Sequence, residues 1–542
     1  MAAFSQRISR IGRAVASLTG WRRAALAVFA GSASVLAFAP FFASPILFLT
    51  LPIFIWLIDG SANPKAAARD GWWFGFGYFF FNLVWLGEAF LVEADKFAWL
   101  LPFAITLLPA AIALFWAWAA AVMRRFWMSG FARVVLFAII LSIAEWLRGH
   151  IFTGLPWNVP GYALTAPVEL MQGAGVFGIY GLTLIALVVF AGPLVILGAT
   201  RAGDRPAWRS ALALAVLPIA ALWGYGAAVL TAPLSFMDGV MLRVVQPSVL
   251  QTEKWRPEHQ RRIFDDHLAL SKTNARGETD NFDGITHVVW PEAAMPFFPL
   301  EAPKALEEIA AVLPDGSMLL TGALRRELPP DSSNQSPGTI AAKAKVFNSI
   351  LALDQDAKLV SIYDKIHLVP FGEYLPAEKM LTAFGLKKLT HGLGAFTPGR
   401  TPREPMAVPG LPPVTGLICY EALFPNEVVQ TESRPGVILN VTNDGWFGNS
   451  TGPRQHFHQS RVRAVEQGVP LIRAANNGIS AVVDPYGRLL GELGMNVRGV
   501  IDSRLPERAP LTPYARFGDL VFLAMLAAAG LLAFGLKVGR HR

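Results

Sequence analysis

Eight long apolar runs constrain the fold of this 542-residue chain more than any other feature of its sequence. They lie near residues 24–39, 43–59, 71–92, 98–122, 131–149, 174–199, 210–231 and 517–536. A helix needs about 20 consecutive apolar residues to cross the ~30 Å hydrocarbon core of a bilayer. Because 53% of the residues are hydrophobic and only 16% are charged, much of the chain must be buried in something other than its own core. The sequence therefore predicts a membrane bundle of about eight transmembrane helices.

Lysine and arginine are distributed unevenly over the loops between these runs. They precede the first run, recur in alternate loops and follow the last run, whereas the loops near 40–43, 93–97 and 150–173 nearly lack them. Cytoplasmic loops are the ones that carry excess Lys and Arg. Both termini are therefore expected inside, and residues 232–510 outside. Since the net charge of +8 is mostly this topology signal, no nucleic-acid partner is expected.

The polar region reads as alternating strands and helices, which is typical of an α/β domain. Strand-like runs lie near 240–245, 286–290, 317–322, 348–353, 359–363, 414–419, 436–441, 470–474 and 480–483, and helical patterns near 257–272, 303–312 and 455–467. We expect three domains: a membrane domain of seven helices (1–231), an external catalytic domain (232–510), and a last transmembrane helix with a cytoplasmic tail (511–542).

Three of the strand-like runs end in a reactive side chain. Glu292, Lys365 and the single cysteine of the chain, Cys419, each follow such a run. An acid, an amine and a thiol at the mouth of a sheet are the parts needed for covalent acyl transfer. A thiol is mostly protonated at neutral pH, so Glu292 is the expected base and Lys365 the expected stabiliser of the oxyanion. A lone buried cysteine is more often inert, but the joint placement favours catalysis.

These segments resemble the three signatures of the nitrilase superfamily. They are Trp290-Pro-Glu292, Tyr363-Asp-Lys365 with Phe371-Gly-Glu-Tyr374, and Cys419-Tyr-Glu421. The resemblance implies an α-β-β-α sandwich with a Glu-Lys-Cys triad. With seven membrane helices before this region and one after it, the chain is similar to the apolipoprotein N-acyltransferase family of the bacterial inner membrane.

The resemblance also implies a reaction and its partners. An acyl chain would pass from a phospholipid to Cys419 as a thioester, and then to the α-amino group of the lipidated N-terminal cysteine of a diacylated lipoprotein. The site would lie on the periplasmic side, in contact with membrane lipids. We expect a monomer without a cofactor.

Four further residues are expected to support the triad. Glu373 is expected to orient Lys365, the alternative being a structural turn residue. The backbone N–H of Tyr420 would help to bind the oxyanion, and Glu421 would either order the nucleophile loop or meet the incoming amine. Trp255 resembles a family tryptophan near the site and is expected to bind substrate, although an interfacial anchor explains it equally well.

Two other segments allow alternative interpretations. Segment 377–397 is apolar and contains glycines at 385, 392 and 394, which suits a lid facing the membrane or, alternatively, a packed surface helix. At the end of the fifth apolar run, Arg148 would either meet a phospholipid phosphate or pair with Glu145 one turn away.

No metal site is predicted. His456 and His458 lie two residues apart and would not face one direction on a helix, and no Cys or carboxylate stands at a matching spacing. Two rival functions remain open at this point. One is a membrane-tethered carbon-nitrogen hydrolase, an amidase or nitrilase with water as the acceptor. The other is a transporter with an external binding domain, which the scarcity of charges in the apolar runs disfavours.

Overall fold

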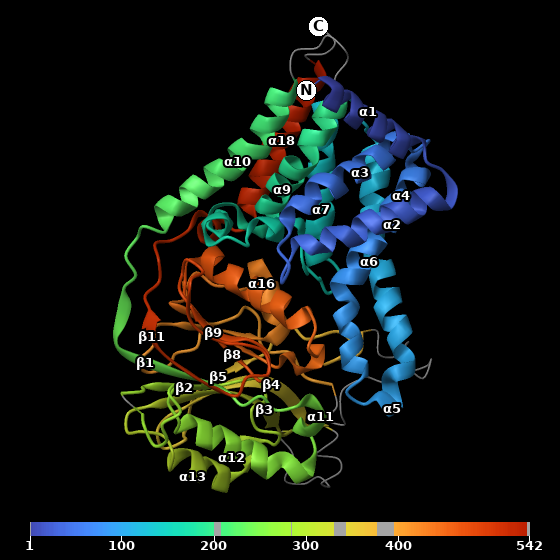
Figure 1. Ribbon diagram of the computed structural model, residues 1–542. Helices are drawn as coiled ribbons and strands as arrows, with labels where there is room; N and C mark the ends of the chain where they lie inside the picture. The colour runs from blue at the N-terminus through green and yellow to red at the C-terminus, as the bar shows by residue number, and fades with distance from the viewer. Residues whose placement is uncertain (1, 200–206, 283, 330–342, 377–394, 539–542) are drawn as a thin grey trace.

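A computed structural model describes residues 2–199, 207–282, 284–329, 343–376 and 395–538 of the chain. Figure 1 shows two parts: a group of long helices from the N-terminal region together with the C-terminal helix, and an α/β part formed by the chain between them. The predicted domain boundaries are close to element ends, since the first strand starts at Phe236 and the helix after the last strand starts at Pro513.

Helices occupy all eight apolar runs of the sequence. The helical part consists of α1 (Ala2–Ser17), α2 (Gly20–Ser34), α3 (Leu47–Gly60), α4 (Pro64–Leu83), α5 (Ala94–Phe97), α6 (Leu101–Arg125), α7 (Phe131–His150), α8 (Val168–Met171), α9 (Gly173–Ala199), α10 (Ala207–Val229), α17 (Pro513–Phe517) and α18 (Leu520–Val538). Helix α9 contains a kink at Gly178, where φ is 63°.

Fewer of these helices qualify as membrane spans than the sequence predicts. Among the described helices, three segments are long and apolar enough to cross a bilayer: Ala94–Arg125, Gly173–Gly198 and Trp208–Val229. Helix α2 is only 15 residues long, and it shares a buried ion pair with α4, in which Arg23 lies 2.8 Å from Asp70. Charged residues such as Arg23 and Asp70 lower the mean hydropathy of the helices that contain them. The bundle of eight spans therefore remains a prediction.

The α/β part contains two sheets. Its strands are β1 (Phe236–Gln246), β2 (His287–Trp290), β3 (Met318–Glu327), β4 (Lys345–Leu353), β5 (Leu359–Asp364), β6 (Val414–Ile418), β7 (Val437–Thr442), β8 (Leu471–Ala475), β9 (Ser480–Val483), β10 (Leu489–Leu493) and β11 (Gly499–Pro506). The six-stranded sheet has the order β11-β1-β2-β3-β4-β5, and the five-stranded sheet the order β10-β9-β8-β7-β6. All nine expected strands are present. Strands β10 and β11 were not predicted, because their partly exposed residues interrupt the apolar pattern.

The two sheets and their covering helices form four layers. Buried residues of both sheets, such as Val289 and Ile418, pack together in one core. Helices α12 (Gln260–Ser271) and α13 (Pro303–Ala310) cover the outer face of the six-stranded sheet, and α16 (Gly452–Gln467) covers the five-stranded sheet on the side of the membrane helices (Figure 1). The expected α-β-β-α sandwich is confirmed.

Helix α16 joins the two parts through buried polar contacts. Trp157 donates to Gln455 at 2.7 Å, and the Thr165 hydroxyl lies 2.8 Å from Nε2 of His458. The main-chain N–H of Ile179, next to the α9 kink, donates to Glu466 at 2.9 Å. Because such buried bonds are specific in direction, they hold the sandwich in one position under the helices.

Candidate active site

Strands β1, β2 and β3 run parallel to one another, as do β6, β7 and β8. Parallel strands place their carboxyl ends at the same edge, where α/β proteins bind ligands. Glu292 follows β2, Cys419 follows β6 and Asn443 follows β7. Lys365 follows β5, which runs antiparallel to its neighbour β4. The structure therefore brings the expected acid, amine and thiol to one region between the two sheets.

Cys419 begins a sharp turn at the end of β6. Its φ is 50°, a left-handed conformation that non-glycine residues rarely adopt, and a short helical turn (Cys419–Leu423) follows. Backbone strain of this kind persists only where the surroundings enforce it, and it is concentrated at functional sites. The side chain is buried, with 8% of the residue exposed.

Glu292 is held by a neutral donor on each carboxylate oxygen. Oε1 accepts from Nδ2 of Asn348 at 2.7 Å, and Oε2 accepts from the main-chain N–H of Asn443 at 2.8 Å. Burial raises the pKa of Glu292, while the charge of Lys365 opposes this effect. A Cβ at Gly322 would stand 2.5 Å from the Cα of Glu292, so only glycine allows β3 to pass so closely. The result is an oriented carboxylate with raised basicity.

Lys365 is buried between two carboxylates. Its Nζ donates to Oε1 of Glu373 at 2.8 Å and lies 4.0 Å from Oε1 of Glu292. Burial by itself disfavours the ammonium, but the two carboxylates reverse that effect and raise the pKa of Lys365 above its usual value. Glu373 also accepts from the N–H of Val369 at 2.8 Å, which fixes the carboxylate against the turn. Glu373 thus lies where orientation of Lys365 requires it.

Burial also sets the protonation state of the expected nucleophile, Cys419. It raises the pKa of the Cys419 thiol to about 12, and the negative charge of Glu292 acts in the same direction while Lys365 opposes it. At neutral pH the thiol is therefore protonated and needs a base at the moment of attack.

Glu421 is occupied in holding the nucleophile turn. Its Oε1 accepts from the Tyr363 hydroxyl at 2.7 Å, from Nη2 of Arg403 at 3.0 Å, and from the N–H groups of Ile366 at 3.0 Å and His367 at 3.1 Å. Its Oε2 accepts from the N–H of Ile418 at 2.8 Å. Glu421 therefore ties the residue before Cys419 to the residues after Lys365. Of the two expected roles, the geometry supports ordering of the loop.

Asn348 is a site residue that sequence reasoning missed. Its Nδ2 bridges Glu292, at 2.7 Å, and Glu373, at 3.1 Å, and its main-chain oxygen accepts from the N–H of Lys365 at 2.8 Å. It lies inside β4 and is buried there, next to the equally polar Ser349, so no pattern in this strand singled it out.

A second buried cluster lies beneath the thiol. The Cys419 sulfur, a carboxylate oxygen of Asp444 and a ring nitrogen of His456 lie within 4.8 Å of one another. The sequence spacing of the histidines did not reveal this group, because its members come from three different elements. Nδ1 of His456 is 2.8 Å from Asp444, and Nε2 is 3.0 Å from the main-chain oxygen of Cys419.

The hydrogen bonds of this cluster stabilise the turn at Cys419. Arg473 donates to Asp444 at 2.8 Å. Although burial acts in the opposite direction, the charges of Arg473 and His456 lower the pKa of Asp444 to about 2. The guanidinium of Arg473 is fixed beside this cluster and would repel a metal cation. The donor set fits a hydrogen-bonded network better than a metal site.

Chelation tests this interpretation. Treating the purified protein with EDTA is expected to leave the thermal midpoint and the rate of Cys419 alkylation unchanged, because Asp444 and His456 are already paired with protein groups. A His456→Ala variant, which breaks the network, is expected to lower the thermal midpoint. A lower thermal midpoint or a changed alkylation rate after EDTA treatment, restored by added zinc, would contradict the prediction.

The remaining expected residues have mixed outcomes. The Tyr420 hydroxyl donates to the main-chain oxygen of Gly154 at 2.7 Å, which links the nucleophile turn to the helical part. Trp255 directly follows Lys254 and is half-buried, and its contact with substrate remains a prediction. Most of the expected lid, 377–394, lies outside the described residues.

Arg148 does not present a free cation to lipid. It is 2% exposed, pairs with Glu145 on the preceding turn, and donates to the main-chain oxygens of Leu155 and Trp157. Of the two alternatives for Arg148, the structure supports the pair with Glu145. The pair anchors the loop that carries Gly154, the partner of Tyr420.

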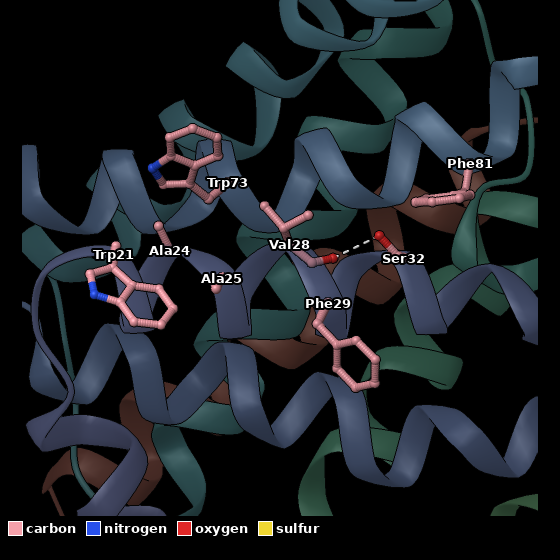
Figure 2. Close-up of a pocket in the computed structure, with 8 residues that line it drawn as sticks. All are labelled: Trp21, Ala24, Ala25, Val28, Phe29, Ser32, Trp73 and Phe81. Carbon is pink, nitrogen blue, oxygen red and sulfur yellow. Dashed lines mark hydrogen bonds between the residues drawn. The ribbon is translucent and has the colours of Figure 1, made fainter.

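Two cavities differ in their relation to this site. A groove of about 700 Å³ lies along α2 and α4, away from the triad, and Figure 2 shows its apolar lining. Its residues are Trp21, Ala24, Ala25, Val28, Phe29, Ser32, Trp73 and Phe81. A cavity of about 550 Å³ lies between α7 and the segment after Lys365, with Ile366, His367, Tyr374 and Phe396 in its wall. The second cavity is therefore the one next to the expected chemistry.

The fold and the site together define the class of the α/β part. A buried thiol, carboxylate and ammonium at strand ends of a four-layer sandwich are typical of carbon-nitrogen hydrolase domains, and the family model described as carbon-nitrogen hydrolase matches residues 244–513. An amidase from Nesterenkonia sp. AN1 aligns with 50% of this chain and 93% of its own at 20% identity, with a TM-score of 0.34.

The helical part and the full-length relatives narrow the class to one family. The model of the apolipoprotein N-acyltransferase N-terminal domain matches residues 30–192. The apolipoprotein N-acyltransferase of Rhodopseudomonas palustris is 46% identical and covers 97% of both chains, and that of Bradyrhizobium diazoefficiens is 44% identical and covers 100% of both. The one of Brucella melitensis is 41% identical, over 98% of this chain and 99% of its own. The chain belongs to the apolipoprotein N-acyltransferase family and is a membrane acyltransferase.

Proposed function

We propose that this protein transfers an acyl chain from a phospholipid, through a thioester on Cys419, to the α-amino group of the lipidated N-terminal cysteine of an apolipoprotein. The names of the relatives support the apolipoprotein acceptor. The phospholipid donor follows from the setting, since an acyl ester dissolved in the bilayer is the substrate that a membrane-bound thiol meets first.

The first half-reaction forms the thioester. Glu292 accepts the proton of Cys419 as the sulfur attacks the ester carbonyl, and Lys365 stabilises the oxyanion together with the N–H of Tyr420. The tetrahedral intermediate collapses, the C–O bond breaks, and the lysophospholipid alkoxide leaves with the proton from Glu292. The enzyme is then acylated and Glu292 is again a carboxylate.

The second half-reaction releases the acyl chain as an amide. The neutral amine of the acceptor attacks the thioester carbonyl while Glu292 accepts a proton from the amine. The C–S bond breaks, and the proton returns to the thiolate of Cys419. Glu373 keeps the ammonium of Lys365 in place in both halves, through its 2.8 Å contact.

The observation that carries the proposal is the strained turn at Cys419, with Glu292 and Lys365 both acting electrostatically on its thiol. The adjoining cavity of about 550 Å³ lies between the helical part and the sandwich, where a lipid chain enters from the membrane. Glu292, Lys365 and Cys419 lie together within one chain, so the proposed chemistry needs no residue from a second copy. The lysine and arginine distribution supports a periplasmic site on an inner-membrane protein.

Intact mass of the purified protein, after incubation with a phospholipid in detergent, tests the thioester. We expect an added acyl mass that hydroxylamine removes, that is absent in Cys419→Ser and that forms much more slowly in Glu292→Gln. Persistent acylation of a lipopeptide by Cys419→Ser would exclude the thioester route. Adding a diacylated lipopeptide to the acyl-enzyme separates N-acylation from the rival hydrolase, which would pass the chain to water and release a free fatty acid.

A further inference from the structure

Lys254 is a buried lysine next to the general base of the proposed function. It is the last residue of α11 (Gln251–Lys254), and only 2% of it is exposed. Its Nζ donates to the main-chain oxygen of Glu292 at 2.9 Å. Lysine is almost never buried to this degree unless its charge is paired. The position of Lys254 therefore calls for an electrostatic explanation.

The charges around Glu292 supply that explanation. Two buried carboxylates, Glu292 and Glu373, share one ammonium in Lys365. Two negative charges against one positive charge would favour protonation of one carboxylate. Among the described residues, the nearby Asp444 is already matched by Arg473, so that pair adds no net charge. Lys254 is a second buried cation beside Glu292, and its positive charge opposes protonation of that carboxylate.

Lys254 also holds the backbone at Glu292. The oxygen that it binds belongs to the peptide between Glu292 and Ala293, and Ala293 has a φ of 45°. A non-glycine residue in this conformation is strained and needs external support. The first residue of the same short helix acts on the other side of the base. Gln251 accepts from Nδ2 of Asn443 at 2.7 Å, and the N–H of Asn443 donates to the Glu292 carboxylate.

We propose that Lys254 is a positioning residue for the general base: it fixes the main chain of Glu292 and supplies the charge that keeps its carboxylate ionised. The role rests on the proposed function, because it acts through Glu292. Lys254 itself does not bond to the thiol or to the acyl group in this scheme.

The titratable groups around the pair agree with this role. Burial raises the pKa of Glu292, with Lys365 and Lys254 opposing the shift and Glu373 reinforcing it. Burial lowers the pKa of Lys254 to about 8, against the charge of Glu292. On the α12 side, burial lowers the pKa of His267 to about 4, so this ring is neutral near pH 7. Cys419 is a further titratable neighbour among the described residues, and its thiol is protonated at that pH.

The test is the pH dependence of Cys419 reactivity in the full-length protein. We would measure S-acylation by phospholipid and alkylation by iodoacetamide, from pH 4.5 to 9, for Lys254→Met, Lys254→Gln and Lys254→Arg. Removing the charge raises the pKa of Glu292, so the carboxylate form is lost at a higher pH. The acid limb should therefore move up by about one pH unit in the Met and Gln variants, a tenfold extra loss of rate on that limb. In Lys254→Arg the acid limb should stay at the wild-type pH.

Controls separate this role from a structural one. Lys272→Met removes an exposed charge from the end of α12 and should change neither profile. A purely structural role would lower the thermal midpoint or the plateau rate and leave the acid limb where it is, which would overturn the proposal. Absence of acylation in the wild type would refute the proposed function instead, while the alkylation profile would still report on Lys254. If Lys254→Met does not fold, the Gln and Arg variants test the charge role. An acid limb at the same pH in Lys254→Gln and Lys254→Arg refutes that role.

Discussion

Replacing Glu292 with glutamine is expected to lower the rate of Cys419 acylation by about 10²–10⁴-fold, which is the usual contribution of a positioned general base. Burial keeps the thiol protonated, with a pKa of about 12, so little thiolate forms without a proton acceptor. Glutamine has the size of glutamate but cannot accept a proton. The rate of appearance of the hydroxylamine-labile acyl mass measures the effect.

The matched control is Glu253→Gln. Glu253 lies in α11 beside the site and pairs with the exposed Arg262, so its substitution should leave the acylation rate within about twofold of the wild type. The thermal midpoint of each variant shows whether the fold is kept. Acylation by Glu292→Gln at more than a tenth of the wild-type rate would remove Glu292 from the role of base.

Replacing Glu421 with glutamine is expected to destabilise the protein by about 3–5 kcal/mol, because it leaves the buried guanidinium of Arg403 without its counter-charge. Both side chains are fully buried, and their closest contact is 3.0 Å. The same change loosens the bond to Ile418 and so releases the nucleophile turn. Thermal unfolding followed by intrinsic fluorescence measures the loss, and the acylation rate should fall with it.

The stability contributed by Glu421 should also depend on pH. Burial alone would raise the pKa of Glu421, but Arg403 and the hydrogen bonds hold it below its usual value. A carboxylate with a lowered pKa stabilises the fold above the pKa of the unfolded chain, and the effect is lost as pH falls through the folded value. Wild-type stability should therefore decrease below about pH 4.5, and the decrease should be smaller in Glu421→Gln. Glu432→Gln, at an exposed carboxylate, should keep the wild-type pH dependence. If the stability of Glu421→Gln and of the wild type changes by the same amount with pH, this account is contradicted.

Local patterns explain why so much of the fold and triad could be predicted. An apolar run reports burial of its own residues, so the nine predicted strands and the helices in the eight apolar runs are found in the structure. The residue that follows a strand lies at the end of the sheet in any sandwich, which is why Glu292, Lys365 and Cys419 could be selected from sequence. The partly exposed strands β10 and β11 carry no such pattern and were missed.

The sequence by itself determined the two-part organisation, nine of the eleven described strands and the three candidate reactive groups, because each of these depends on residues that are near one another along the chain. The tertiary structure alone decided the partners of those groups. Asn348 bridges carboxylates 56 and 25 positions away, and Lys254 reaches the carbonyl of Glu292 across 38 positions. The tertiary structure also decided between the two alternatives for Arg148, which pairs with Glu145 inside the protein. Charge balance and hydrogen bonding in a buried site are sums over neighbours in space, and no local pattern in the chain records them.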